Sequence, residues 1–218
     1  CERLAHEENR EHRNLQKQYQ GTASDPQRLQ AAGQLFAVLL LSGKSGIASD
    51  PDAASAEFPT LEQLAPTEPQ AAEQALHSKL FMPAPGHEER LIPCHRSIAE
   101  YLAAAWLAGE LDSKRLPLQR LLNLLLGADG GVVSDLRGLY AWLALHSISV
   151  RTRLIEADPL SVILYGDARP MSLIDKRHLL SSLQEKAKDF AGFRWNLMHS
   201  LHPFSALADE ELVEDFRK

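Results

Sequence analysis

Most of this 218-residue chain alternates between apolar stripes at helical spacing and short polar breaks. Residues 1–20 are polar and mixed in charge, which predicts an exposed helix there. A strongly apolar segment over 28–41 predicts a buried helix. Asp25 as its N-cap, Pro26 at its first position and Ser42-Gly43 at its end are the expected boundary signals.

The next segment is acidic and rich in proline. Several prolines over 45–70 rule out one continuous helix, so we expect a linker that contains short helices. Thr60 and Thr67 each place a capping hydroxyl ahead of a helix start, and the second of these helices should run over about 68–80. The segment 45–78 lacks Lys and Arg and carries the acids Asp50, Asp52, Glu57, Glu62, Glu68 and Glu73.

A hairpin and a sharply bounded helix are expected next. The apolar segments 80–82 and 90–92 flank the sequence Pro-Ala-Pro-Gly-His-Glu-Glu, which predicts two strands joined by an exposed turn. Ser97 and Glu100 have the spacing of a capping box, so a helix should cover 98–108 and end at Gly109.

Beyond residue 111 the pattern is that of short successive helices. They are expected at about 116–126, 134–147, 150–156, 159–165 and 172–190. Asp158 before Pro159, and Ser172 three residues before Asp175, are helix start signals. We therefore expect a mainly α fold. Region 1–110 should be helical and winged-helix-like with a small β-hairpin, and 111–218 should form irregular HEAT-like stacked helical hairpins.

Charge and composition narrow the function class. The formal net charge is −6, and Lys and Arg are scattered among acids. A nucleic-acid binder normally shows a basic stripe, so nucleic acid is not an expected partner. No apolar run approaches the roughly 18 residues of a membrane helix. Two cysteines, Cys1 and Cys94, fit a reducing, cytoplasmic compartment. A chain that starts at Cys1 is expected to be a piece of a longer polypeptide.

Two patterns imitate catalytic sites. Ser42-Gly43-Lys44-Ser45 resembles the end of a phosphate-binding loop, but Val38 stands where that loop needs glycine. Cys94 next to His95 invites a thiolate interpretation. Neighbours on a strand point to opposite faces, which favours a small buried cysteine and a structural histidine instead. No catalytic residue is expected in this chain.

Histidines offer few metal ligands. His6 and His12 fall on different helix faces, whereas His199 and His202 share a face without an evident third ligand. This second pair allows the hypothesis of a small metal-dependent hydrolase. Metal analysis of the purified protein would test it. The candidate interaction patch is the amphipathic run Phe193, Arg194 and Trp195.

The run HRSIAEYLAAAWL over 95–107 resembles the junction of NACHT/STAND-type signalling NTPases, where a wing hairpin leads into an HRS-x-x-EYLAA helix. The matching motif residues are His95, Arg96, Ser97, Glu100 and Tyr101. The resemblance implies an upstream nucleotide-binding domain of the same chain, with ATP and Mg²⁺ bound there. It also implies a protein or small-molecule ligand on the helical array.

The same resemblance makes His95 a candidate for contact with nucleotide of that missing module, because a winged-helix histidine contacts phosphate in the family. The family's P-loop, magnesium-binding acid and sensor arginine have no counterpart here, so no cofactor is expected in this chain. Our first hypothesis is a non-catalytic regulatory and sensor fragment of a NACHT-like signalling ATPase, of bacterial origin. The alternative is a free-standing helical-repeat adaptor, which predicts a native start codon close to Cys1.

Overall fold

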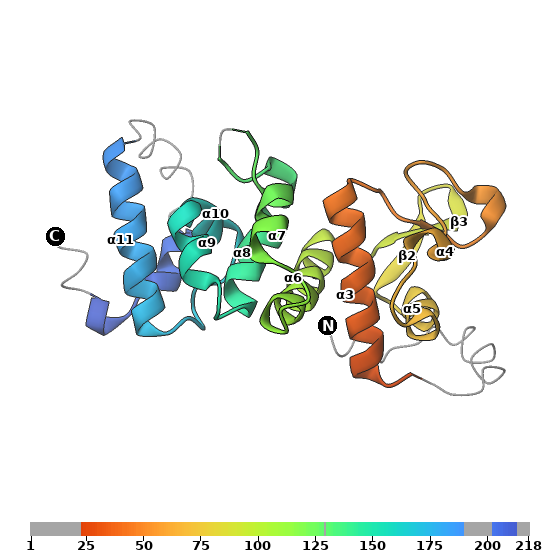
Figure 1. Cartoon of the computed structure of the whole chain (residues 1–218), viewed down its shortest axis with the longest axis horizontal. Helices are drawn as coiled ribbons and strands as arrows, with labels where there is room; N and C mark the ends of the chain where they lie inside the picture. The colour runs from red at the N-terminus through yellow and green to blue at the C-terminus, as the bar shows by residue number, and fades with distance from the viewer. Residues whose placement is uncertain (1–22, 129, 190–201, 213–218) are drawn as a thin grey trace. The chain divides into compact units, whose positions relative to one another are not determined.

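The computed structural model describes residues 23–128, 130–189 and 202–212. The chain forms two compact units, Cys1–Leu107 and Ala108–Lys218, and their boundary falls inside helix α6 (Arg96–Asp112). Figure 1 shows the elements of each unit. The helix expected over 1–20 lies outside the described residues.

The first unit opens with the buried helix that the apolar segment predicts. This helix, α3, covers Asp25–Ser42 and buries Leu35 and Phe36. Its N-cap is Ser24 and not Asp25, because the Asp25 carboxylate pairs with Arg28 inside the first turn. The end is as expected, since Gly43 adopts a left-handed conformation with φ 63°.

A three-stranded antiparallel sheet follows, with strand order β1-β3-β2. The strands are β1 (Ile47–Ala48), β2 (Phe81–Ala84) and β3 (His87–Pro93). The expected hairpin is confirmed, but β1 lies in the segment that the prolines marked as a linker. Gly46 permits this pairing, because a Cβ atom there would lie 2.2 Å from the carbonyl oxygen of Leu91.

Short helices connect β1 to β2. They are the 3₁₀ turn η1 (Pro51–Ala53), α4 (Leu61–Leu64) and α5 (Pro69–Leu76). The Thr60 hydroxyl caps α4 as expected and accepts from the Gln63 amide at 3.3 Å. The predicted Thr67 cap is wrong, because Glu68 holds that position and the Thr67 amide donates to the Gln34 side chain.

The second of these helices is shorter than the sequence suggests. It ends at Leu76 and not near residue 80, because Ser78 turns the chain toward β2. The buried Ser78 hydroxyl donates to the Ala75 carbonyl at 2.6 Å and accepts from the Leu80 amide at 3.3 Å. Phe36 of α3 then stacks on Phe81 of β2, with ring centroids 4.7 Å apart. The described elements of this unit follow the order helix, strand, short helices, hairpin and helix.

Helix α6 begins earlier and ends later than expected. The His95 carbonyl accepts from the amides of Ile98 and Ala99, so His95 stands at the cap position and Ser97 lies within the first turn. The predicted capping box is therefore wrong, and Glu100 instead pairs with Arg96 at 2.9 Å. The helix also continues through Gly109 to Asp112. A glycine within a helix lowers its stability only slightly, and packing of the apolar face outweighs this loss here.

Two helices of the first unit approach each other closely. A Cβ atom on Gly33 of α3 would lie 2.6 Å from the Leu102 carbonyl oxygen of α6 and 2.9 Å from the Trp106 Cβ. Ala99 and Ala103 are fully buried in the same helix. Small residues on facing positions allow this short separation, as the run of alanines suggests.

The named elements of the second unit are all helices in its described residues. Its elements are α7 (Leu118–Leu125), η2 (Ser134–Leu136), α8 (Arg137–His146), α9 (Arg151–Ala157), α10 (Pro159–Tyr165), α11 (Leu173–Asp189), η3 (His202–Leu207) and η4 (Glu210–Leu212). Helix α8 packs on α9 and α10, and α9 packs on α11. The expectation of a mainly α fold with a small hairpin is confirmed. Among the described helices, none combines the length and apolar character needed to cross a membrane.

Two predicted helix starts in this unit are confirmed. The Asp158 carboxylate accepts from the Ser161 amide at 3.0 Å, and Pro159 follows at the first helical position of α10. The Ser172 hydroxyl accepts from the Asp175 amide at 3.1 Å at the start of α11. Each signal lies within one turn of chain, so the local sequence is sufficient to place it.

Candidate functional site

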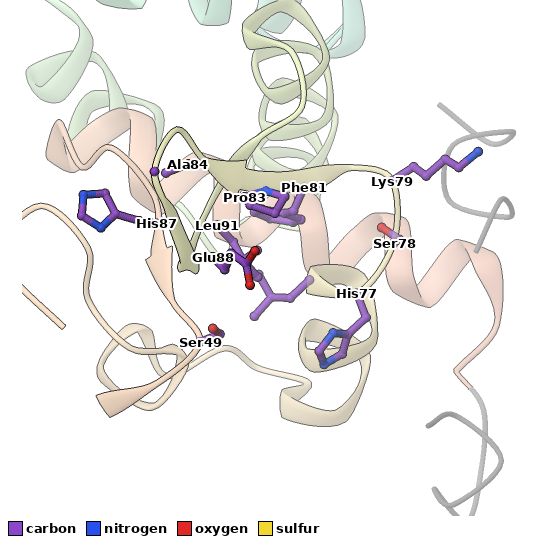
Figure 2. A pocket seen from close by; sticks show the side chains of 12 residues that line it. Ser49, His77, Ser78, Lys79, Phe81, Pro83, Ala84, His87, Glu88 and Leu91 are labelled. Atoms are coloured by element: carbon purple, nitrogen blue, oxygen red, sulfur yellow. The ribbon is translucent and has the colours of Figure 1, made fainter. Parts of the chain in front are cut away.

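A cavity of about 750 Å³ opens in the first unit beside the β2-β3 hairpin. Its walls come from three places: the end of α5 with the turn behind it, both strands of the hairpin, and the residue that follows β1. Figure 2 shows this arrangement. The residue after strand β1 joins the wall, because antiparallel pairing of β1 with β3 brings Ser49 to the hairpin.

The polar side chains of the cavity differ in where they point. In Figure 2 the Glu88 carboxylate lies toward the middle of the cavity, with Ser49 and His77 at its rim. Lys79 contributes to the wall, but its side chain extends away from the cavity. The ring of His87 also lies to the outside. A single carboxylate is thus the charged group closest to the cavity centre.

Apolar and polar groups contribute about equally to the cavity wall. Leu76 comes from α5, Phe81 and Pro83 from β2, and Leu91 from β3. Pro83 pairs with Leu91 across the hairpin, and the register shifts directly after it, between Pro83 and Ala84. Such irregularities re-aim the side chains that follow. The cavity therefore combines apolar residues with polar ones, among which Glu88 is the acidic group.

The surface around the cavity is acidic. Between residues 45 and 93 the only Lys and Arg residues are Lys79 and Arg90. Arg90 is already engaged, because its Nε donates to the Ala53 carbonyl at 3.1 Å and its guanidinium lies over the Phe58 ring. The same stretch carries the acids Asp50, Asp52, Glu57, Glu62, Glu68, Glu73, Glu88 and Glu89.

The HRS motif forms the start of α6 and does not line the cavity. His95 is exposed, and its Nδ1 lies 2.8 Å from the Ser97 hydroxyl and 3.3 Å from the Ser97 amide. An Nδ1 that accepts from an amide leaves the proton of a neutral imidazole on Nε2. The exposed Arg96 forms an ion pair with the largely buried Glu100, and Tyr101 is half-buried. These residues cap and brace the helix.

The two sequence patterns that resemble catalytic motifs have structural roles. Gly43 ends α3, and the neighbouring Lys44 donates to the Ala56 carbonyl at 2.6 Å, which fixes the acidic loop. Burial raises the pKa of the Cys94 thiol, which keeps it protonated at neutral pH. Cys94 also donates its amide to the Leu80 carbonyl at 2.9 Å, so it extends the hairpin.

Several predicted residues fall outside the described part of the chain. These are His6, His12, His199 and the interaction patch of Phe193, Arg194 and Trp195. The side chain of His202 is likewise not described. Within the described ranges, no group of three or more His, Cys, Asp or Glu side chains could hold a metal ion.

Comparisons of the chain with protein-family models, with curated proteins and with solved structures found no match. The site therefore rests on its own geometry. The sequence predicts the hairpin but not Glu88, Ser49 and His77 as lining residues of one cavity, and Ser49 reaches that cavity only through pairing between β1 and β3. The one local signal was the acidic pair Glu88-Glu89 at an exposed turn.

Proposed function

We propose that this chain is a non-catalytic regulatory and sensor region of a NACHT-like signalling ATPase. In this role it couples ligand or partner sensing to a nucleotide-binding module of the same polypeptide, where ATP and Mg²⁺ would bind. The observation that carries the proposal is the order of elements. A winged-helix-like unit runs through β3 directly into the helix that starts at His95-Arg96-Ser97, and a helical unit follows.

The geometry of His95 supports a contact with nucleotide in that module. Its ring is exposed, and the Ser97 amide at 3.3 Å from Nδ1 favours the tautomer with a proton on Nε2. An outward Nε2–H group at a helix N-terminus is suited to donate to a phosphate oxygen. The structural role of His95 and this role are compatible because they use different ring nitrogens.

Electrostatics favour a protein contact over a DNA contact for this winged-helix-like unit. Helix α5, which precedes the hairpin, carries no Lys or Arg, and the hairpin itself presents Glu88 and Glu89. A DNA-binding winged helix needs basic groups on these elements to neutralise phosphates. Phosphate would therefore be repelled here.

The test has two steps. The coding sequence upstream of Cys1 is read for a P-loop, and the full polypeptide is then loaded with a fluorescent ADP analogue. We expect His95→Ala to speed ADP release about tenfold, since a hydrogen bond to a charged group contributes on the order of 1.5–3 kcal/mol. His87→Ala removes another exposed histidine, on β3, and should leave the release rate unchanged. A full coding sequence without a P-loop would contradict the proposal.

A free-standing helical-repeat adaptor is the second candidate. It is favoured by the packing of successive helices α8, α9, α10 and α11 on one another, which offers an extended surface without catalytic groups. This alternative predicts that the native protein has an intact mass close to the 24.2 kDa of this chain. A much larger native protein would exclude it.

A further inference from the structure

We propose that the cavity beside the hairpin binds an arginine or lysine side chain from a basic segment of a partner protein. The chemistry of the cavity carries this inference: its central charged group is Glu88, and apolar residues form part of its wall. The proposal stands apart from the regulatory role above, because it needs no nucleotide-binding module.

The size of the cavity suits a side chain. About 750 Å³ lies within the range of about 300–1,000 Å³ typical of small-ligand pockets. Lysine and arginine carry long aliphatic stems that pack on apolar surface while the charged head reaches a polar group. Pro83 and Leu91 offer such a surface, and Glu88 lies on the same strand as Leu91.

Glu88 is available for a partner. Its carboxylate forms no hydrogen bond or ion pair with any residue in the described part of the chain. The two bases nearby do not compete, since Lys79 extends away from the cavity and Arg90 is held by Ala53 and Phe58. A cation entering the cavity therefore meets an unneutralised carboxylate.

The surrounding charge favours a polypeptide over a free amine. Acidic residues continue well beyond the cavity, on the loop after β1 and on β3. A segment with several basic residues would gain from this wider field as well as from Glu88, whereas a single amine would use the cavity alone. The same field repels nucleic acid.

The experiment measures fluorescence anisotropy of a labelled nine-residue arginine-rich peptide with the whole chain and two matched variants. Glu88→Gln removes the carboxylate in the cavity, and Glu89→Gln removes the same charge from the neighbouring residue, which does not line it. Loss of a charge-assisted hydrogen bond should raise Kd about tenfold for Glu88→Gln. Glu89→Gln should change Kd less than about twofold, as expected for a screened rim charge.

Equal weakening in both variants would show diffuse attraction to an acidic surface and overturn the proposal, as would absence of binding to the wild-type chain. Arginine methyl ester that competes as tightly as the peptide would point to a small-amine site and also overturn the protein partner. Glu88 is exposed, and circular dichroism of each variant checks that the fold is retained. A failed peptide experiment leaves the ADP-release experiment intact, so the two proposals fail separately.

Discussion

Glu88 of the first unit and Arg151 of the second use their charged groups in opposite ways. In the first unit, Glu88 points into an open cavity without a partner among the described residues. In the second unit, buried Arg151 of α9 donates to the carbonyls of Ala144 and Leu145 and pairs with Asp175 of α11. The Tyr140 hydroxyl of α8 similarly donates to the Leu154 carbonyl at 2.6 Å.

This difference distinguishes a group that is available for binding from a group that stabilises the fold. A buried polar group that is fully partnered fixes the positions of the helices it joins, and it has no capacity left for a ligand. An unpartnered carboxylate in a cavity contributes little to stability and retains its full capacity to bind. We therefore expect substitutions in the second unit to act on stability, and substitutions at the cavity of the first unit to act on binding.

The largest expected effect is that of Arg151→Met. It leaves two helix-end carbonyls and the Asp175 carboxylate without their donor, which should cost about 3 kcal/mol of stability in the second unit. Hydrogen exchange of α9 and α11 measures this loss. Arg153→Met removes an exposed arginine from the same helix and should change protection by less than about 0.5 kcal/mol. Equal effects would end the distinction between the units.

The next effect should be confined to the first unit. Gly46→Ala would place a Cβ atom 2.2 Å from the Leu91 carbonyl oxygen, so β1 and β3 must separate. We expect a loss of about 2 kcal/mol, read from exchange of the β3 amides, with α8 to α11 unchanged. Gly109→Ala is the matched control. It meets no atom within 4 Å in α6 and should stabilise that helix by about 0.5–1 kcal/mol.

Acid should weaken the second unit through Asp175. Burial raises the pKa of this carboxyl, but hydrogen bonds from Ser172 and Arg151 outweigh burial and hold the pKa below its usual value. A lowered pKa contributes stability above the unfolded value of about 3.9, and this is lost as pH falls through the folded value. Between about pH 6 and pH 3, Asp175→Asn should therefore lose less stability than wild type in urea unfolding. Identical pH slopes would contradict this.

The smallest expected effect on stability is that of Glu88→Gln. The side chain is exposed and has no partner among the described residues, so the free energy of unfolding should change by less than about 0.5 kcal/mol. Urea unfolding measures this. A loss similar to that of Arg151→Met would show that Glu88 belongs to the scaffold, and the contrast between the units would fail.

How much of the fold could be predicted depended on the distance between interacting residues. Asp158-Pro159 and Ser172 placed helix starts correctly, because the cap and its acceptor lie within one turn. The start of α6 could not be predicted in this way, because two residues compete for its cap position. Both His95 and Ser97 can cap a helix. In the structure His95 holds the cap position, and the Arg96–Glu100 ion pair forms only once the helix has brought these two residues together.

The candidate site was less predictable than the fold. The hairpin was expected, but β1 is two residues long and pairs with β3 across more than 40 positions of sequence, as in the pair Ile47 and Leu91. A strand this short has no periodicity to read, and its register depends on the fit of Gly46 against Leu91. Ser49 joins the cavity only through that pairing, so no local pattern could place it in the same cavity as Glu88.

The most direct test of the central claim is a titration of the isotope-labelled chain with the arginine-rich peptide, followed by backbone amide NMR. We expect shift changes at His77, Glu88 and Leu91, with the amides of α8 to α11 unaffected. Shift changes centred on the second unit, or spread evenly over the acidic surface, would contradict the assignment of binding to the cavity and of scaffolding to the helical unit.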